Sequence, residues 1–240
     1  MSGPGCNFDG TFYRPFWTEI ASYGYLVIAI GPPPAEGSRP VLWKNSADDY
    51  MTALNWAFVE NSRKGSIYYS KIDTSNVALF GQSCGGIQAL RIADDPRVTT
   101  LVFWNSGSQL MGNVGPTDNT KRLNTTSDLM GNRDLKQLVK SLKIPTAYFV
   151  GNTDMARNSA LDDFNDIKDI PVFFAVREIP GDSHGGTFRE KNGDGFAVDG
   201  VAWLNWITKG DKEAAAMFKG DPCLLAEDPK WIEIKKKNID

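Results

Sequence analysis

The sequence predicts an α/β fold, with a mostly parallel central sheet and helices on both faces. Short apolar runs of strand length alternate with longer amphipathic segments along the chain, which is the order that βαβ units produce. The runs at residues 76–82, 145–150 and 171–178 are apolar at most positions, as strands buried on both faces are. The chain has 240 residues, of which 41% are hydrophobic, and this is enough for one full core. We therefore expect residues 1–240 to form a single α/β domain.

The first part of the chain is expected to hold two helices and two strands. Residues 11–23 have the pattern of a helix, and residues 25–30 form a continuous apolar run that predicts a strand. That run ends at a glycine and three prolines. Ser46 and Asp49 have the spacing of a helix capping box, and the apolar residues after them recur at helical spacing. The second strand is expected over residues 76–82.

The rest of the chain continues the alternation of helices and strands. Residues 107–133 are polar and rich in Gly, Asn and Thr, which indicates a long loop beside the candidate site. The other expected elements are helix 84–93, strand 99–104, strand 145–150, helix 156–167, strand 171–178 and helix 197–208.

Composition and charge argue against several classes of partner. The net charge of −3 argues against a nucleic-acid partner. No apolar run approaches the ~20 residues of a membrane span. No zinc or phosphate-loop pattern occurs, so no metal or cofactor is expected. The lysines at residues 235–237 are expected to be a solvated end. No signal peptide is visible, so the chain as written is expected to be unexported, whereas a longer form with such a peptide would be secreted.

Gly81-Gln82-Ser83-Cys84-Gly85 is the most informative motif. It has the form G-x-S-x-G and lies between an expected strand and an expected helix. This order is the context of a nucleophile elbow, in which a sharp turn holds the serine hydroxyl above the sheet. Glycines flank the serine because a side chain there would collide with the adjoining strand or helix. The motif therefore predicts that Ser83 is a nucleophile.

His184 is the only histidine in the chain, and it lies in a Gly-rich loop after the strand at residues 171–178. A serine hydroxyl needs an adjacent base at neutral pH, and imidazole, with an ordinary pKa of about 6.5, suits that task. We therefore expect His184 to be the base that activates the serine.

A carboxylate between the serine and the histidine is expected to complete a triad in the chain order Ser, Asp, His. Asp154 fits best, because it follows a buried-type strand that breaks at a glycine. A carboxylate there would accept the imidazole N–H and fix its tautomer. Asp162 and Asp163 lie in an expected helix, and Asp182 is so close to His184 that we expect it to shape the turn.

Three further segments are informative: A-S-Y-G-Y-L-V-I at residues 21–28, I-Y-Y-S-K-I-D at residues 67–73 and G-V-A-W-L at residues 200–204. With the elbow motif and the triad order, they resemble the dienelactone-hydrolase-like branch of the α/β hydrolases. Within that branch the sequence is similar to the cutinase-like polyester hydrolases, including PET-degrading enzymes, from about residue 5 to about residue 223. The resemblance implies an α/β-hydrolase fold and cofactor-free hydrolysis of a small or polymeric ester.

The resemblance also implies roles for residues around the triad. The backbone N–H groups of Cys84 and Cys6 would be the oxyanion donors. Trp104 falls where the family has an aromatic substrate clamp, and a core position fits it equally well. Asn105 would line the same cleft. Gln82 stands where the family usually has His, Trp or Tyr before the nucleophile, and it is expected to contact substrate.

Two departures from the family concern the cysteines and the start of the chain. In the family, the positions of Cys6 and Cys84 face each other, which implies a disulfide; two free thiols are the alternative. The family also has strands ahead of the oxyanion loop, one of them central, whereas this sequence begins at that loop and is N-terminally shortened. Strands 25–30 and 76–82 would then pair directly, or the chain would be a truncated product.

Together these features predict a serine carboxylic-ester hydrolase that works through a Ser-His-Asp triad and an acyl-enzyme intermediate. The narrower expectation, from the resemblance alone, is a cutinase-like polyesterase. The alternative is a catalytically inactive hydrolase-fold protein that binds a small hydrophobic ligand or a partner. A lyase or cyclase that uses the same pocket is a third reading.

Overall fold

A six-stranded sheet, in the order β1-β2-β3-β4-β5-β6, runs through the centre of the protein. The structure is a computed structural model that describes residues 1–6, 8, 10–31, 46–110 and 134–240. Strands β1 to β5 pair in parallel, and β6 is antiparallel to β5. The predicted α/β fold with a mostly parallel sheet is therefore confirmed. The strands are β1 (Ser2–Gly3), β2 (Val77–Gln82), β3 (Val98–Trp104), β4 (Thr146–Gly151), β5 (Val172–Arg177) and β6 (Trp231–Lys237).

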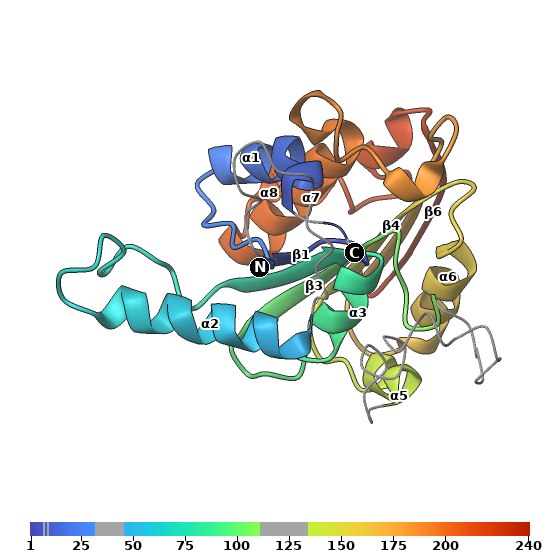
Figure 1. Cartoon of the computed structure of the whole chain (residues 1–240). Helices are drawn as coiled ribbons and strands as arrows, with labels where there is room; N and C mark the ends of the chain where they lie inside the picture. Colours follow the sequence, from blue (N-terminus) through green and yellow to red (C-terminus); the bar gives the residue numbers. More distant parts are fainter. Residues whose placement is uncertain (7, 9, 32–45, 111–133) are drawn as a thin grey trace.

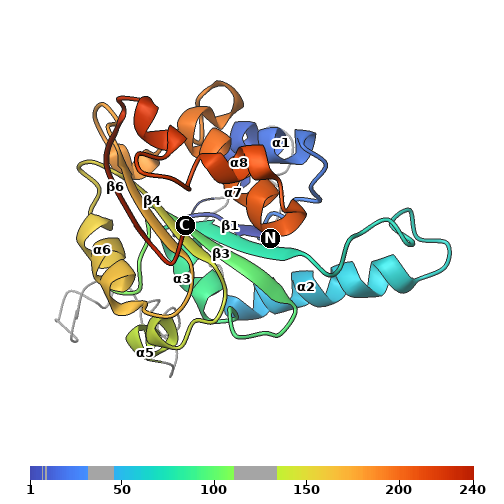
Figure 2. The same cartoon turned by 180° about the vertical axis from the view of Figure 1, so that it is seen from behind.

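Helices cover both faces of this sheet (Figures 1 and 2). One face carries α2 (Ala47–Ser62), α3 (Cys84–Leu90), α5 (Leu135–Lys140) and α6 (Arg157–Asp166). The other carries α1 (Arg14–Ser22), α7 (Asp194–Lys209) and α8 (Lys212–Ala216). Short 3-10 turns are η1 (Gly10–Tyr13), η3 (Ser183–Gly185), η4 (Lys191–Gly193) and η5 (Leu224–Glu227). In the part of the chain that the structure describes, no helix is long and apolar enough to cross a membrane.

The predicted helices at residues 11–23, 84–93, 156–167 and 197–208 are found within a few residues of their expected bounds. The capping box that begins α2 is also confirmed. The N–H of Asp49 donates to Ser46 Oγ at 3.2 Å, and the N–H of Ser46 donates to Asp49 Oδ2 at 2.8 Å. Most of the predicted loop at residues 107–133 lies outside the described residues, which resume at residue 134.

Side chains along the strands alternate between two apolar clusters, one on each face of the sheet. In β3, Leu101 and Phe103 join the cluster under α2 and α3, while Val102 and Trp104 join the cluster under α1 and α7. The side chains of β4 and β5 alternate in the same way. Because both faces are buried, nearly every position in these strands is apolar, which explains the continuous apolar runs in the sequence.

The predicted strand at residues 25–30 is wrong. This segment forms one isolated bridge, between Ala29 and Ser2, and no regular strand. Direct pairing of the segment with β2 is also wrong, because β1 lies between them. The physical reason is that β1 supplies only two residues, so most of the segment has no neighbouring strand among the described residues. The interpretation that the chain is N-terminally shortened stays a prediction.

The lysines at residues 235–237 belong to β6 and not to a loose end of the chain, although Lys235 is exposed to solvent as expected. Lys237 Nζ donates to the carbonyl oxygens of Phe164, at 2.7 Å, and Ile167, at 3.1 Å. Both carbonyls lie at the C-terminal end of α6, where the helix dipole favours a cation. An edge strand rich in lysine is also protected against pairing with other chains. The same lysines weaken the strand signal in the sequence.

Candidate active site

Ser83 occupies the turn between β2 and α3. Its backbone has φ 53° and ψ −123°, a conformation that non-glycine residues rarely adopt. A Cβ added to Gly81 would lie within 3.0 Å of the Gly85 backbone, and one added to Gly85 would lie within 3.0 Å of the Gly3 backbone. Close packing around the turn therefore requires both glycines of the motif, as predicted. The strand, strained turn and helix follow one another in the order that the motif predicts.

His184 lies in η3, after β5, and its ring faces the elbow. Its Nε2 atom is 3.1 Å from Ser83 Oγ. The side chain of His184 is 27% exposed, so solvent reaches the ring. Asp182 Oδ1 accepts the backbone N–H of His184 at 3.0 Å. Asp182 therefore shapes this turn, as the sequence suggested.

Asp154 follows β4 and contacts the other side of the imidazole. Its Oδ2 atom is 2.7 Å from His184 Nδ1, and its Oδ1 accepts the N–H of Ala156 at 2.5 Å. An ionised carboxylate only accepts hydrogen bonds, so Nδ1 carries the proton and the Nε2 lone pair faces Ser83. The hydrogen bond that His184 donates to Asp154 raises the pKa of His184, and the partial burial of the ring opposes that rise. The structure thus brings the three predicted triad residues together.

The competing carboxylates Asp162 and Asp163 lie in α6. Asp163 is buried in α6, where it accepts hydrogen bonds from the N–H of Ser108, at 2.6 Å, and from Lys136 Nζ, at 3.1 Å. Among the predicted candidates, Asp154 is the carboxylate that contacts the imidazole ring.

Cys6 and Cys84, the predicted oxyanion residues, form a disulfide. The predicted bond is therefore confirmed, and it joins the N-terminal loop to the elbow. Cys84 is the first residue of α3, where backbone N–H groups have no acceptor within the helix. The remaining cysteine, Cys223, is free and buried.

Trp104 lies in the core, which was one of the two positions predicted for it. Its side chain is 1% exposed and packs edge-on against Phe16 and Phe80, with ring centroids 5.0 and 5.4 Å apart. The family-derived expectation of a substrate clamp at Trp104 is therefore corrected. The reason is that alternation along β3 turns this residue toward the α1 and α7 side.

Asn105 is fully buried and does not line a cleft, which corrects a second family-derived expectation. Its Oδ1 accepts the N–H of Gly151 at 2.8 Å. Its Nδ2 donates to the carbonyls of Ser183, at 2.8 Å, and His184, at 3.0 Å. Asn105 has φ 45°, a backbone conformation that asparagine tolerates better than most residues. It therefore joins the ends of β3 and β4 to the turn that holds His184.

Gln82 is 6% exposed, and its neighbours are site residues. Its Nε2 donates to the carbonyl of His184 at 3.1 Å and lies 3.2 Å from His184 Nε2. Its Oε1 accepts the hydroxyl of Tyr13 at 2.8 Å, and that hydroxyl accepts the N–H of Gly5 at 2.8 Å. This chain of hydrogen bonds joins the loop that holds Cys6 to the turn that holds His184.

Tyr13 is the site residue that sequence reasoning missed. It is 2% exposed, and burial raises the pKa of its hydroxyl well above the ordinary value. Its position in an apolar, helix-like segment gives no sign of a polar task. Only the fold shows that its hydroxyl reaches Gln82.

No group of His, Cys, Asp or Glu side chains suited to hold a metal ion occurs among the described residues. A scan against protein-family models and a search of curated proteins gave no match to this chain.

Proposed function

We propose that this protein is a serine carboxylic-ester hydrolase. The observation that carries the proposal is the continuous hydrogen-bonded line from Asp154 through His184 to Ser83, with contacts of 2.7 and 3.1 Å. A serine held at a strained turn, with a base and a carboxylate in line, is the arrangement that activates a hydroxyl for attack on a carbonyl.

In the proposed reaction, Ser83 Oγ attacks the ester carbonyl carbon while His184 Nε2 takes the hydroxyl proton. Negative charge then develops on the carbonyl oxygen, and the backbone N–H groups of Cys84 and Cys6 are its proposed donors. The imidazolium, stabilised by Asp154, gives its proton to the leaving alcohol, and an acyl-enzyme remains. Water, activated by the same imidazole, then attacks the acyl-enzyme and releases the acid.

Two exposed apolar side chains support a substrate with apolar groups. Phe8, two residues after Cys6, is 48% exposed, and Met155, next to Asp154, is 68% exposed. Both belong to loops that supply site residues. A cutinase-like polyester substrate stays a proposal that rests on the resemblance.

The test is a reaction of the 240-residue protein with a fluorophosphonate, followed by mapping of the adduct by mass spectrometry. We expect a single adduct at Ser83 and none in the Ser83→Ala protein. Ser106 is the matched control for this serine, and we expect no adduct on it. It is buried and donates to the Ser83 carbonyl at 2.7 Å, but it does not contact the base. Absence of an adduct on the folded protein would instead favour the inactive, ligand-binding alternative.

The rate of this labelling is expected to fall as the pH is lowered through the raised pKa of His184. The base must be neutral to accept the serine proton, and the hydrogen bond that the imidazole donates to Asp154 favours its charged form. The midpoint of the pH profile should therefore lie above 6.5, the ordinary value. Rate constants measured from about pH 5 to about pH 9 give the midpoint. A midpoint at or below the ordinary value would contradict the proposed contact between the base and the carboxylate.

A further inference from the structure

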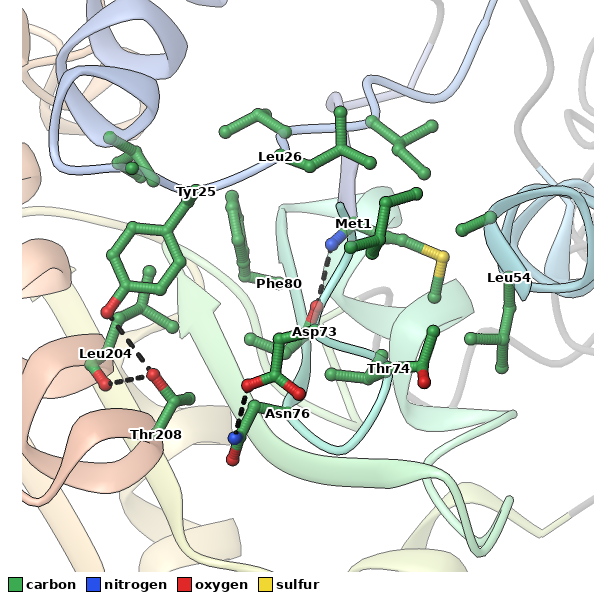
Figure 3. A pocket seen from close by; sticks show the side chains of 18 of the residues that line it. Met1, Tyr25, Leu26, Leu54, Asp73, Thr74, Asn76, Phe80, Leu204 and Thr208 are labelled. Atoms are coloured by element: carbon green, nitrogen blue, oxygen red, sulfur yellow. Dashed lines mark hydrogen bonds between the residues drawn. The ribbon is translucent and has the colours of Figure 1, made fainter. Parts of the chain in front are cut away.

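Gln82 is the last residue of β2, and its side chain lies on the same side of the sheet as that of Phe80, two residues before it. Phe80 joins the cluster under α1 and α7 and, with Tyr25 and Leu204, lines a cavity of about 200 Å³ (Figure 3). Neither Gln82 nor Ser83 lines that cavity. The Gln82 side chain, which is only 6% exposed, is instead buried beside the turn that holds the serine.

Two contacts fix the orientation of the Gln82 amide. The N–H of Gly5 donates to the Tyr13 hydroxyl, so the hydroxyl proton is left to donate to Gln82, and Oε1 is the amide atom that can accept it. At the other end of the amide, Gln82 Nε2 lies 3.1 Å from the carbonyl oxygen of His184, which can only accept. Both contacts therefore place Nε2, with its two protons, on the side of His184.

The second proton of this amide faces the imidazole ring. Gln82 Nε2 is 3.2 Å from His184 Nε2, and Ser83 Oγ is 3.1 Å from the same ring nitrogen. Because Asp154 holds the ring proton on Nδ1, the neutral ring has one lone pair and no proton at Nε2. An amide N–H and a hydroxyl therefore share a single acceptor. When the ring is charged, its Nε2–H meets the amide N–H, and neither group can accept.

We propose that Gln82 is a positioning residue that acts through His184: its amide N–H keeps Nε2 an acceptor and disfavours the charged ring. The proposal rests on the proposed function, in which His184 is the base. Gln82 itself gains and loses no proton. In the resting protein it keeps Nε2 unprotonated, as the attack by Ser83 requires. After the attack, the imidazolium finds no acceptor in the amide, so its proton passes to the leaving alcohol.

Gln82 acts against two carboxylates that favour the charged ring. Asp154 contacts Nδ1 at 2.7 Å, Asp182 accepts the backbone N–H of His184, and both raise the pKa of the imidazole. The Tyr13 hydroxyl stays neutral over the range of the test, because burial raises its pKa well above the ordinary value. The test below changes neither carboxylate, so the amide of Gln82 can be examined separately from them.

The test is the titration of His184, followed by nitrogen-15 NMR of its ring in protein made without a histidine tag. His184 is the only histidine, so the ring signals need no further assignment. Gln82→Met removes both amide protons and keeps a side chain of similar length. We expect its titration midpoint to lie at least ~0.5 pH unit above that of the unaltered protein, because a hydrogen bond to the neutral ring is lost. An unchanged or lower midpoint would overturn the proposal.

Tyr13→Phe is the matched control, because it breaks the same line of hydrogen bonds at its far end. It leaves Gln82 Nε2 bound to the His184 carbonyl, so the amide keeps its orientation. We expect this protein to melt at a lower temperature than the unaltered protein, while its titration midpoint stays within ~0.2 pH unit. Equal midpoint shifts in the two variants would mean that Gln82 only supports the fold, which contradicts the proposal.

Circular dichroism shows whether the Gln82→Met protein folds. If it does not, the unaltered protein still tests the proposal, because the two side-chain protons of Gln82 have different acceptors. One of their resonances is expected to shift with the midpoint of His184, and constant resonances through that midpoint would overturn the proposal.

The titration does not depend on catalysis, so the two proposals can fail separately. If no protein in the series is labelled at Ser83, the proposed function fails, while the midpoints still test the contact between Gln82 and His184. If Ser83 is labelled but Gln82→Met leaves the midpoint unchanged, the proposed function stands and the role of Gln82 is refuted.

Discussion

Replacing Asp154 with asparagine is expected to lower the rate of Ser83 labelling about 10⁴-fold while the protein stays folded. The N–H of Ala156 donates to Asp154 Oδ1 at 2.5 Å, and this contact fixes the orientation of the new amide. The amide oxygen keeps that bond, so the NH₂ group faces His184 Nδ1. Nδ1 must then accept, and the proton moves to Nε2. A protonated Nε2 has no lone pair to take the proton of Ser83.

Asp182→Asn is the matched control for this substitution. It makes the same chemical change two residues from His184. The Asp182 carboxylate accepts a hydrogen bond from the backbone N–H of His184 and does not contact the ring. We expect its labelling rate to stay within about tenfold of the original, since an amide oxygen also accepts that hydrogen bond. Equal losses in the two proteins would mean that Asp154 does not set the tautomer. Second-order rate constants for fluorophosphonate labelling at one pH measure both.

Replacing Gly85 with alanine is expected to lower the free energy of unfolding by about 3 kcal/mol. The new Cβ would lie within 3.0 Å of the backbone of Gly3 and of the Pro4 carbonyl oxygen. Backbone atoms cannot move aside as a flexible side chain can, so β1 or α3 must shift. Either shift disturbs the parallel pairing of Ser2 and Gly3 with β2. Urea unfolding followed by circular dichroism measures the loss.

Gly185→Ala provides the comparison for that measurement. Gly185 lies next to the proposed base, and a Cβ added there meets nothing within 4 Å. We expect its free energy of unfolding to change by less than about 0.5 kcal/mol. If both substitutions destabilise the protein equally, the close approach of Gly85 to β1 is not the cause.

The meeting of Ser83, His184 and Asp154 could be predicted from the sequence because each residue has a strong local signal. Ser83 lies in a strand–turn–helix motif, His184 is the only histidine, and Asp154 follows a strand that ends at a glycine. In a parallel sheet, residues that follow successive strands meet at one edge, so local signals were enough to place these three together. The continuous apolar runs also predicted β2 to β5, because each of these strands is buried on both faces.

The errors arise where a residue's place depends on a distant part of the chain. The apolar run at residues 25–30 has the composition of a strand, but pairing requires a neighbour, and β1 is only two residues long. The roles of Tyr13 and Asn105 depend on hydrogen bonds to Gln82, Gly151 and the histidine turn, which no spacing in the sequence encodes. Trp104 shows the limit of a resemblance. Its aligned position in the family implied a substrate contact, whereas the alternation of side chains along β3 places it in the core.

The disulfide between Cys6 and Cys84 also acts on the unfolded chain. It joins residues that are 78 positions apart, so the oxidised unfolded chain contains a closed loop. That chain therefore has fewer conformations than the reduced unfolded chain. In the chain-entropy model, closing a loop of this length favours folding by about 4–5 kcal/mol. That is a large fraction of the ~5–15 kcal/mol that stabilises most domains. Oxidation of this one cysteine pair therefore has two effects. It favours folding of the whole chain, and it attaches the N-terminal loop beside Ser83.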